Sequence, residues 1–252
     1  MILSMLDDIY SGPMLKIKRA YCHIHELESR VQDYIKTDFY SISINEDPKT
    51  GNQSLKFAVP EPVPEYFSLC IGDAIHNLRS ALDILICSIV RCAGGDITKC
   101  EFPFSYDKEK LIKIMEKGEI NKVRPDLIPF ILDTIKPYKI GNLDIWNLNL
   151  LDNIDKHRLI IPVISVTQLS GISAKDDNDN ILTDLTASIN NIGTINIINT
   201  TAKLHIISYG QRDITLIFDK GLPFESEPVI PKLHILADKT TSIIDSFRII
   251  TS

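Results

Sequence analysis

The chain has 252 residues, of which 44% are hydrophobic and 24% are charged, and its net charge is −6. These values are typical of a globular protein with a substantial core, and they exclude an overall basic footprint for nucleic acid, although a local basic groove stays open. No apolar run approaches the roughly 20 residues of a membrane span, and the start MILSMLDDIYSG lacks the pattern of a secretory signal. We therefore expect a cytoplasmic protein with no membrane partner.

The number and spacing of the cysteines are consistent with a protein in a reducing compartment. Their number is odd and no CxxC spacing occurs among Cys22, Cys70, Cys87, Cys92 and Cys100. Reduced thiols are the plain interpretation of this pattern, and a zinc site is the alternative.

Apolar periodicity predicts a helical core in the first part of the chain. Its three main helices are expected over residues 14–36, 68–92 and 143–159. The first follows the break Gly12-Pro13, and Pro162 closes the third. Between the first two, YSISINEDPKTGNQSLKFAV has the alternation and the turn residues of a β-hairpin. Two shorter helices are expected over residues 107–117 and 125–135.

Beyond residue 160 the pattern changes to short β-branched segments separated by Gly, Asn and Asp, among them KLHIISY at 203–209 and ITLIFDK at 214–220. Such segments predict an antiparallel sheet, and apolar spacing over 231–249 predicts a closing helix. The fold class is therefore expected to be α+β, with a helical core, a hairpin insertion, a sheet and a C-terminal helix. We expect a helical part over residues 1–160 and a β-rich part over 161–252, packed together as one globular unit.

The stretch DAIHNLRSALD, residues 73–83, is the most informative motif. At about 100° per residue, an apolar stripe separates from a polar side. That polar side carries Asp73, His76, Asn77, Arg79, Ser80 and Asp83. Because the helix becomes apolar nearly all round after this motif, these groups should be buried, where charges must be paired or used. A carboxylate beside His76 would prepare it for acid–base chemistry, and the alternative is a polar network that sets the helix register.

A second motif, LDNIDKHR at residues 151–158, places Asp155 and Arg158 on the core-facing side of its helix. Their natural partners are on the preceding motif, as an Arg79–Asp155 or an Asp83–Arg158 pair. His157 projects toward Trp146 and Leu150. One polar clasp between the two helices would explain both motifs.

The first helix carries Arg19, His23, Glu26 and Arg30 along one side, at the boundary of its apolar seam. At this position the four residues could belong to a functional site, or they could form ion pairs on a solvated helix face.

The segments HIHELE, IHNLRSALD and NIDKHR resemble, over residues 14–160, an uncharacterised family of bacterial hypothetical proteins. More loosely, the chain is similar to the HEPN superfamily of helical ribonucleases and nucleotide-binding proteins. Members of that superfamily carry an Arg followed four to six residues later by a His, facing a dimer interface. Arg19 with His25 meets this spacing, whereas Arg79 has no His at that distance. The resemblance implies a ribonuclease and a homodimer.

Three functions follow from these motifs. The first is a HEPN-like ribonuclease or toxin-type effector, as in phage defence, which binds RNA through a local groove. In this function His76 or His23 transfers the proton, and Arg19 and Arg79 stabilise the negative charge on the phosphate. The second is a non-enzymatic interaction or ligand-binding protein in which the motifs form a structural clasp. The third is a metal-dependent hydrolase. We predict neither a cofactor nor a resident metal ion. The candidate catalytic residues are His76, Arg79, Asp83, Asp155, His157, Arg158, Arg19 and His23.

Overall fold

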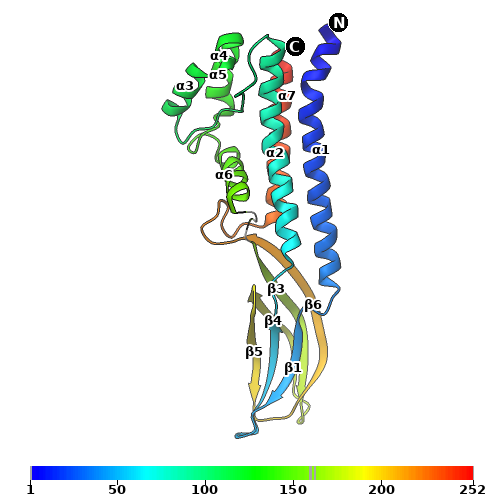
Figure 1. Ribbon diagram of the computed structural model, residues 1–252. Coiled ribbons are helices and arrows are strands. Elements are labelled where there is room, and N and C mark those ends of the chain that lie inside the picture. Colours follow the sequence, from blue (N-terminus) through cyan, green and yellow to red (C-terminus); the bar gives the residue numbers. More distant parts are fainter. Residues whose placement is uncertain (1, 159–160, 162, 252) are drawn as a thin grey trace.

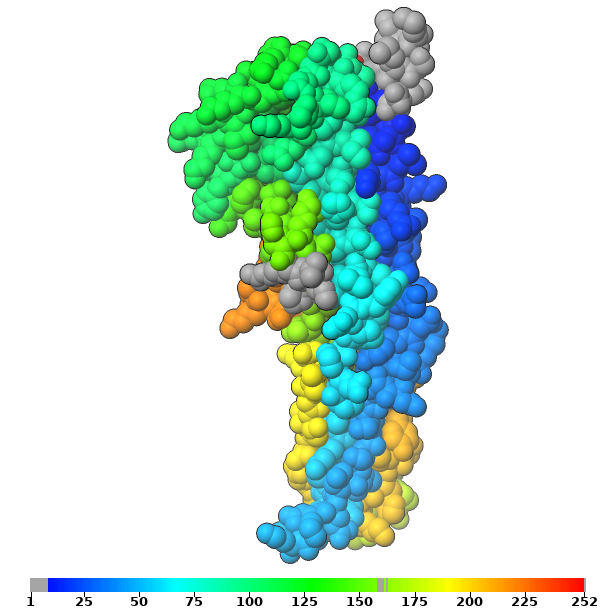
Figure 2. All heavy atoms as spheres, viewed as in Figure 1, coloured from blue at the N-terminus to red at the C-terminus, as the bar shows by residue number. Residues whose placement is uncertain are grey.

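A computed structural model of the chain describes residues 2–158, 161 and 163–251, without the side chains of residues 2–8 and 158. Helices form one end of an elongated molecule and strands the other (Figure 1). The long helices α1 (Ile2–Ile35), α2 (Glu65–Cys92) and α7 (Val229–Thr251) lie side by side. Both chain termini lie at the helical end, and Figure 2 shows the same outline in space-filling form. This arrangement confirms the α+β class.

Helix α1 begins earlier than the sequence predicts. Proline lacks an amide donor and crowds the preceding turn, so a start at Met14 was expected, but the helix runs from Ile2 through Pro13. Residues on both sides of the proline, such as Tyr10 and Ile17, are buried in the helical core. Tertiary packing thus carries the helix across a position that opposes it locally.

Short helices form a cap on one side of α2. They are α3 (Lys108–Lys117), α4 (Glu119–Val123), α5 (Ile128–Phe130) and the single turns η1 (Pro125–Leu127) and η2 (Ile131–Ile135). The helix predicted over 125–135 is therefore a succession of 3-10, α and π turns, because Pro125 and Pro129 each remove an amide donor. Helix α6 (Leu143–Arg158) packs against α2. Its predicted last residue, 159, lies outside the described residues.

The strands form two antiparallel sheets of three strands each. In one, the predicted hairpin β1 (Ser41–Glu46) and β2 (Gln53–Val59) is joined by β5 (Gly193–Thr200). In the other, β3 (Val163–Asp176) lies between β4 (Ile181–Asn190) and β6 (Leu204–Phe218). The expected single sheet is thus two, and two predicted segments, 203–209 and 214–220, fall largely within the single long strand β6. Side chains including Leu55, Phe57, Leu169 and Ile172 fill the core of this end.

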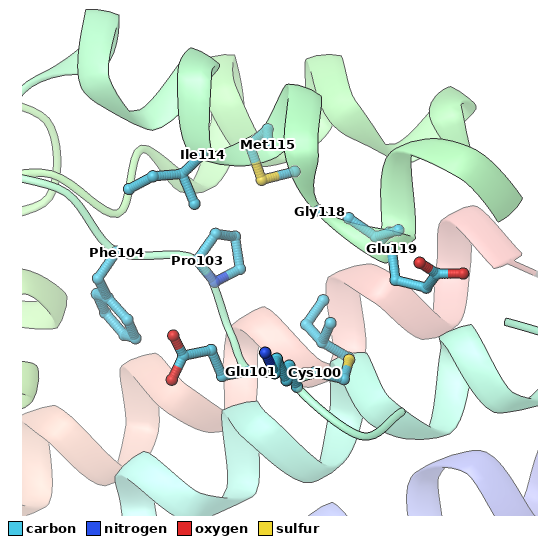
Figure 3. A pocket seen from close by; sticks show the side chains of 11 residues that line it. Cys100, Glu101, Pro103, Phe104, Ile114, Met115, Gly118 and Glu119 are labelled. Carbon is cyan, nitrogen blue, oxygen red and sulfur yellow. The ribbon is translucent and has the colours of Figure 1, made fainter. Parts of the chain in front are cut away.

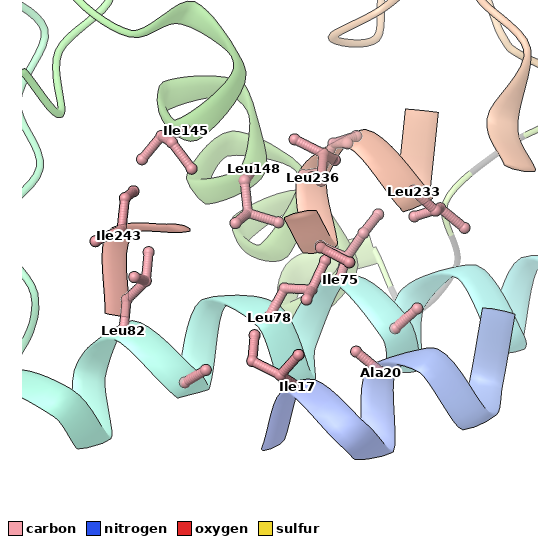
Figure 4. Packing of buried hydrophobic residues seen from close by; sticks show 14 of the residues in the cluster. Ile17, Ala20, Ile75, Leu78, Leu82, Ile145, Leu148, Leu233, Leu236 and Ile243 are labelled. Atoms are coloured by element: carbon pink, nitrogen blue, oxygen red, sulfur yellow. The ribbon is translucent and has the colours of Figure 1, made fainter. Parts of the chain in front are cut away.

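Helix α2 is at the centre of the helical end, in contact with α1, α6 and α7 (Figure 4). Its residues Ile75, Leu78 and Leu82 meet apolar side chains of all three neighbours. The polar side of α2 is less buried than the sequence predicts. Asn77 and Arg79 are buried at helix–helix contacts, whereas Asp73 is exposed. The other polar residues of the motif are half-buried, namely His76, Ser80 and Asp83. Among the described helices, none is both long and apolar enough to cross a membrane.

Candidate functional site

The seam between α2 and α6 holds a histidine bound to a buried carboxylate. His76 Nδ1 lies 2.9 Å from Asp152 Oδ1, and the second oxygen, Oδ2, accepts a hydrogen bond from Lys156 Nζ at 2.5 Å. The Asp152 side chain is 1% exposed, whereas the His76 side chain is 45% exposed. A fixed, desolvated carboxylate therefore orients an imidazole that solvent and ligands can reach.

The other ring nitrogen of His76 faces Ser80, one helical turn further along α2. Ser80 Oγ lies 3.3 Å from His76 Nε2. Because Asp152 can only accept a proton while it is ionised, the neutral ring carries its hydrogen on Nδ1 and presents Nε2 as the acceptor. The row Ser80–His76–Asp152 thus selects one tautomer, as a proton-transfer group requires.

Arg79 is buried and has a structural set of partners. Its Nε donates to Asn149 Oδ1 at 2.9 Å, and its guanidinium lies 4.5 Å from the centre of the Phe104 ring. Nη1 is in ion-pair contact with Asp83, at an angle that leaves it without a hydrogen bond among the described residues. Asp83 Oδ1 also accepts the backbone N–H of Phe102 at 2.8 Å. Arg79 therefore ties α2 to α6 and to the segment that follows α2.

These contacts correct the predicted pairing. The expected Arg79–Asp155 pair does not form, since Arg79 binds Asp83 and Asn149 instead. The alternative Asp83–Arg158 pair lies outside the described side chains. A polar clasp between α2 and α6 does exist, but different partners make it.

Asp155 lies against α2 at a glycine. A Cβ on Gly72 would overlap the Asp155 carboxylate, so this position accepts the acid only because residue 72 has no side chain. Burial raises the pKa of Asp155 above its ordinary value, and the charges of Asp152 and Asp73 raise it further. No hydrogen bond or ion pair holds this carboxylate among the described residues. Asp155 is thus the least compensated acid of the seam.

On its other side α2 meets the first motif of α1. His23 is buried, and its Nδ1 lies 3.8 Å from Asp73 Oδ2. Burial lowers the pKa of His23, and Arg19 lowers it further, while Asp73 acts in the opposite direction. Lys16 Nζ donates to Asn77 Oδ1 at 3.2 Å. This part of α1 thus contributes cations close to the polar side of α2.

The Arg19–His25 spacing does not produce a common site. Arg19 is exposed. His25 instead turns toward α7, where Glu28 bridges it to His234 at 2.9 and 2.8 Å. His23 and His25 therefore belong to different helix interfaces.

The α2–α6 seam and the segment after α2 bring together His76, Arg79, Asp83 and Asp155 from the predicted set. His157 is exposed on α6, five residues beyond Asp152. Sequence reasoning missed four residues that complete the seam, which are Ser80 as a partner of the ring, Asn149, Asp152 and Lys156. A signal for Asp152 was present, since it follows the core residue Leu148 by one helical turn.

No cluster of three or more His, Cys, Asp or Glu side chains in the described part of the chain is arranged to hold a metal ion. The five cysteines are free thiols, with Cys70 buried and Cys22 and Cys92 exposed.

No family model, curated protein or solved structure matches this chain.

Proposed function

We propose that this protein is a ribonuclease of HEPN type in which His76 transfers the proton. The observation that carries the proposal is the pairing of a half-exposed imidazole with the buried carboxylate of Asp152, 2.9 Å away. This pairing holds the ring in one tautomer, with Nδ1 toward Asp152 and Nε2 as the acceptor beside Ser80, as general acid–base catalysis requires. The looser similarity of the chain to the HEPN superfamily, which is based on the spacing of Arg19 and His25 in the sequence, suggests the substrate class.

Ser80 favours this reaction over acyl transfer. A serine nucleophile needs nearby donors for the oxyanion, but Ser80 lies in the interior of α2, where backbone N–H groups are bonded within the helix. RNA cleavage needs no protein nucleophile, because the 2′-hydroxyl of the substrate loses its proton and attacks the adjacent phosphorus. The bond from phosphorus to the 5′-oxygen of the next nucleotide breaks, and that oxygen takes up a proton. Ser80 then serves to position the ring of His76.

Residues other than Arg79 must interact with the negative charge of the phosphate. Arg79 is 8% exposed and is held by Asn149, Asp83 and the Phe104 ring, so it cannot reach a substrate. Lys156 donates to the same carboxylate of Asp152 that binds His76. Lys16 donates to Asn77, the residue that follows His76 in the chain. We assign them the attraction of the RNA backbone.

The test compares wild type with His76→Gln and Asp152→Asn on end-labelled single-stranded RNA, with thermal melting of each sample. We expect each variant to lose about 10²-fold or more in cleavage rate, because the proton-transfer group or its orientation is lost. His205→Gln, an exposed histidine on β6 paired with Asp177, is the matched control and should cleave at the wild-type rate. A chelator should have no effect. Wild-type cleavage by a folded His76→Gln variant, or no cleavage by wild type, would refute the proposal.

A second candidate is a non-enzymatic protein in which these motifs only hold helices together. The burial of Arg79 between Asn149 and Phe104 favours it, since those contacts account for Arg79 without any substrate. The two candidate functions predict different results for the His76→Gln variant. In the second, His76→Gln alters stability alone.

A further inference from the structure

A separate apolar pocket lies between the C-terminal half of α2 and the cap helices α3 and α4 (Figure 3). Its volume is about 240 Å³. The apolar part of its wall comes from Ile86, Pro103, Phe104, Ile114, Met115 and Ile120. For comparison, a cavity of about 150 Å³ is large enough to hold benzene. The pocket therefore has room for a branched aliphatic side chain with a polar head at the opening.

The polar lining of the pocket carries two charges of opposite sign that no other described residue binds. Lys99 and Glu101 line it, both are exposed, and neither has a hydrogen-bond or ion-pair partner among the described residues. Glu119 also lines it but is already engaged, by Lys122 at 2.7 Å and by the backbone N–H of Asp96 at 3.3 Å. One cation and one carboxylate are thus left for a ligand.

We propose that this pocket binds a small apolar molecule carrying both an ammonium and a carboxylate group, that is, an apolar amino acid. The side chain enters the apolar interior, Glu101 receives the ammonium group, and Lys99 receives the carboxylate. A ligand with one charge would satisfy only one of these residues. Phe104 lines the pocket and also stacks on Arg79, but His76 and its partners Ser80 and Asp152 do not line it. This proposal therefore does not depend on the proposed function.

The NMR signal of the Met115 methyl group can show directly whether a ligand occupies the pocket. The chain has four methionines, and the other three are Met1, Met5 and Met14 at its N-terminal end. Among the methionines whose side chains the structure describes, Met115 lines the pocket and Met14 does not, and the Met115 side chain is buried there. In protein labelled with ¹³C at the methionine methyl groups, the Met115 signal is assigned by its loss in Met115→Leu.

The titration uses L-leucine and two analogues that each lack one charge, 3-methylbutylamine and 4-methylpentanoate. We expect leucine to shift the Met115 signal saturably, and each analogue to bind roughly tenfold more weakly. Glu101→Gln should remove the preference for leucine over 4-methylpentanoate, and Lys99→Gln the preference over 3-methylbutylamine. Glu116→Gln, an exposed acid on α3 outside the pocket, is the control and should change neither preference.

Two results would overturn the proposal. One is a Met115 signal that does not move at leucine concentrations up to about 10 mM. The other is equal binding of leucine and a single-charge analogue by wild type. All substituted residues in the charge series are exposed, so the variants should remain folded, and melting curves check this.

Discussion

At the scale of single residues, Asp155 shows how a missing side chain shapes a site. Gly72 leaves the space on α2 that the Asp155 carboxylate fills, and the other acids of the seam surround it. Its raised pKa means that the folded protein binds the proton more tightly than the unfolded chain does. The free energy of unfolding therefore falls as the pH rises from the ordinary pKa of 3.8 through the higher value of the folded state.

Asp155→Asn should remove this penalty. We expect the variant to be more stable than wild type at pH 7 and to gain less at pH 4, where a larger fraction of the acid is protonated in the folded protein than at pH 7. Urea unfolding followed by the fluorescence of Trp146, the single tryptophan, measures the difference. Asp38→Asn, at an exposed acid, should show no such dependence on pH. An equal gain at both pH values, or a loss at pH 7, would contradict this account.

At the scale of elements, Arg79 joins three segments, namely α2, α6 and the extended chain around Phe104. Lysine cannot replace this arrangement, because one ammonium group cannot donate to Asn149, pair with Asp83 and stack on Phe104 together. The helices on both sides of the seam therefore depend on a planar guanidinium.

Arg79→Ala should lower the free energy of unfolding by about 3 kcal/mol, since it leaves Asp83 and Asn149 without their partner. Arg79→Lys should recover only part of that loss. Arg91→Ala, at an exposed arginine of the same helix, should stay within about 0.5 kcal/mol of wild type. Urea unfolding measures all three variants, and near-wild-type stability of Arg79→Ala would show that the seam does not depend on this residue.

At the scale of the whole molecule, strand β6 connects the two ends. Its residues Ile214, Leu216 and Phe218 belong to the helical core, whereas Leu204 belongs to the core between the sheets. The β3–β6 ladder runs from the Val163–Phe218 pair to the Asp176–Leu204 pair. Disruption of either core therefore destabilises β6, and β6 also contributes buried residues to the other core.

We expect the helical and strand ends to unfold together. Phe218→Ala should destabilise the protein by about 3–5 kcal/mol, as for a large aromatic side chain removed from a core. The Phe218→Ala substitution should also shift two urea midpoints by the same amount. One is measured by the fluorescence of Trp146 at the helical end, and the other by hydrogen exchange of the β2–β5 amides at the strand end. Exposed Tyr209→Ala, on the same strand, is the control for a ring outside both cores. Different midpoints for the two probes would show that the ends unfold separately.

What could be predicted from the sequence was what depends on local period and local turns. Apolar spacing located α2, α6 and α7, and the DPKTG turn located the β1–β2 hairpin, because side-chain period and turn chemistry act over a few residues. The polar side of α2 was recognised in the same way, including His76 and Arg79. These features did not require knowledge of any distant partner.

The tertiary structure decided the features that depend on partners far apart in the chain. It carried α1 through Pro13 and paired β2 with β5 across more than 130 residues. It also selected Asp152 as the partner of His76, and Asn149 rather than Asp155 as the α6 partner of Arg79. A period shows which side of an element is apolar or polar, but it does not show which residue of another element lies opposite. That choice depends on how the packed helices are rotated and shifted against one another, and therefore on the whole core at once.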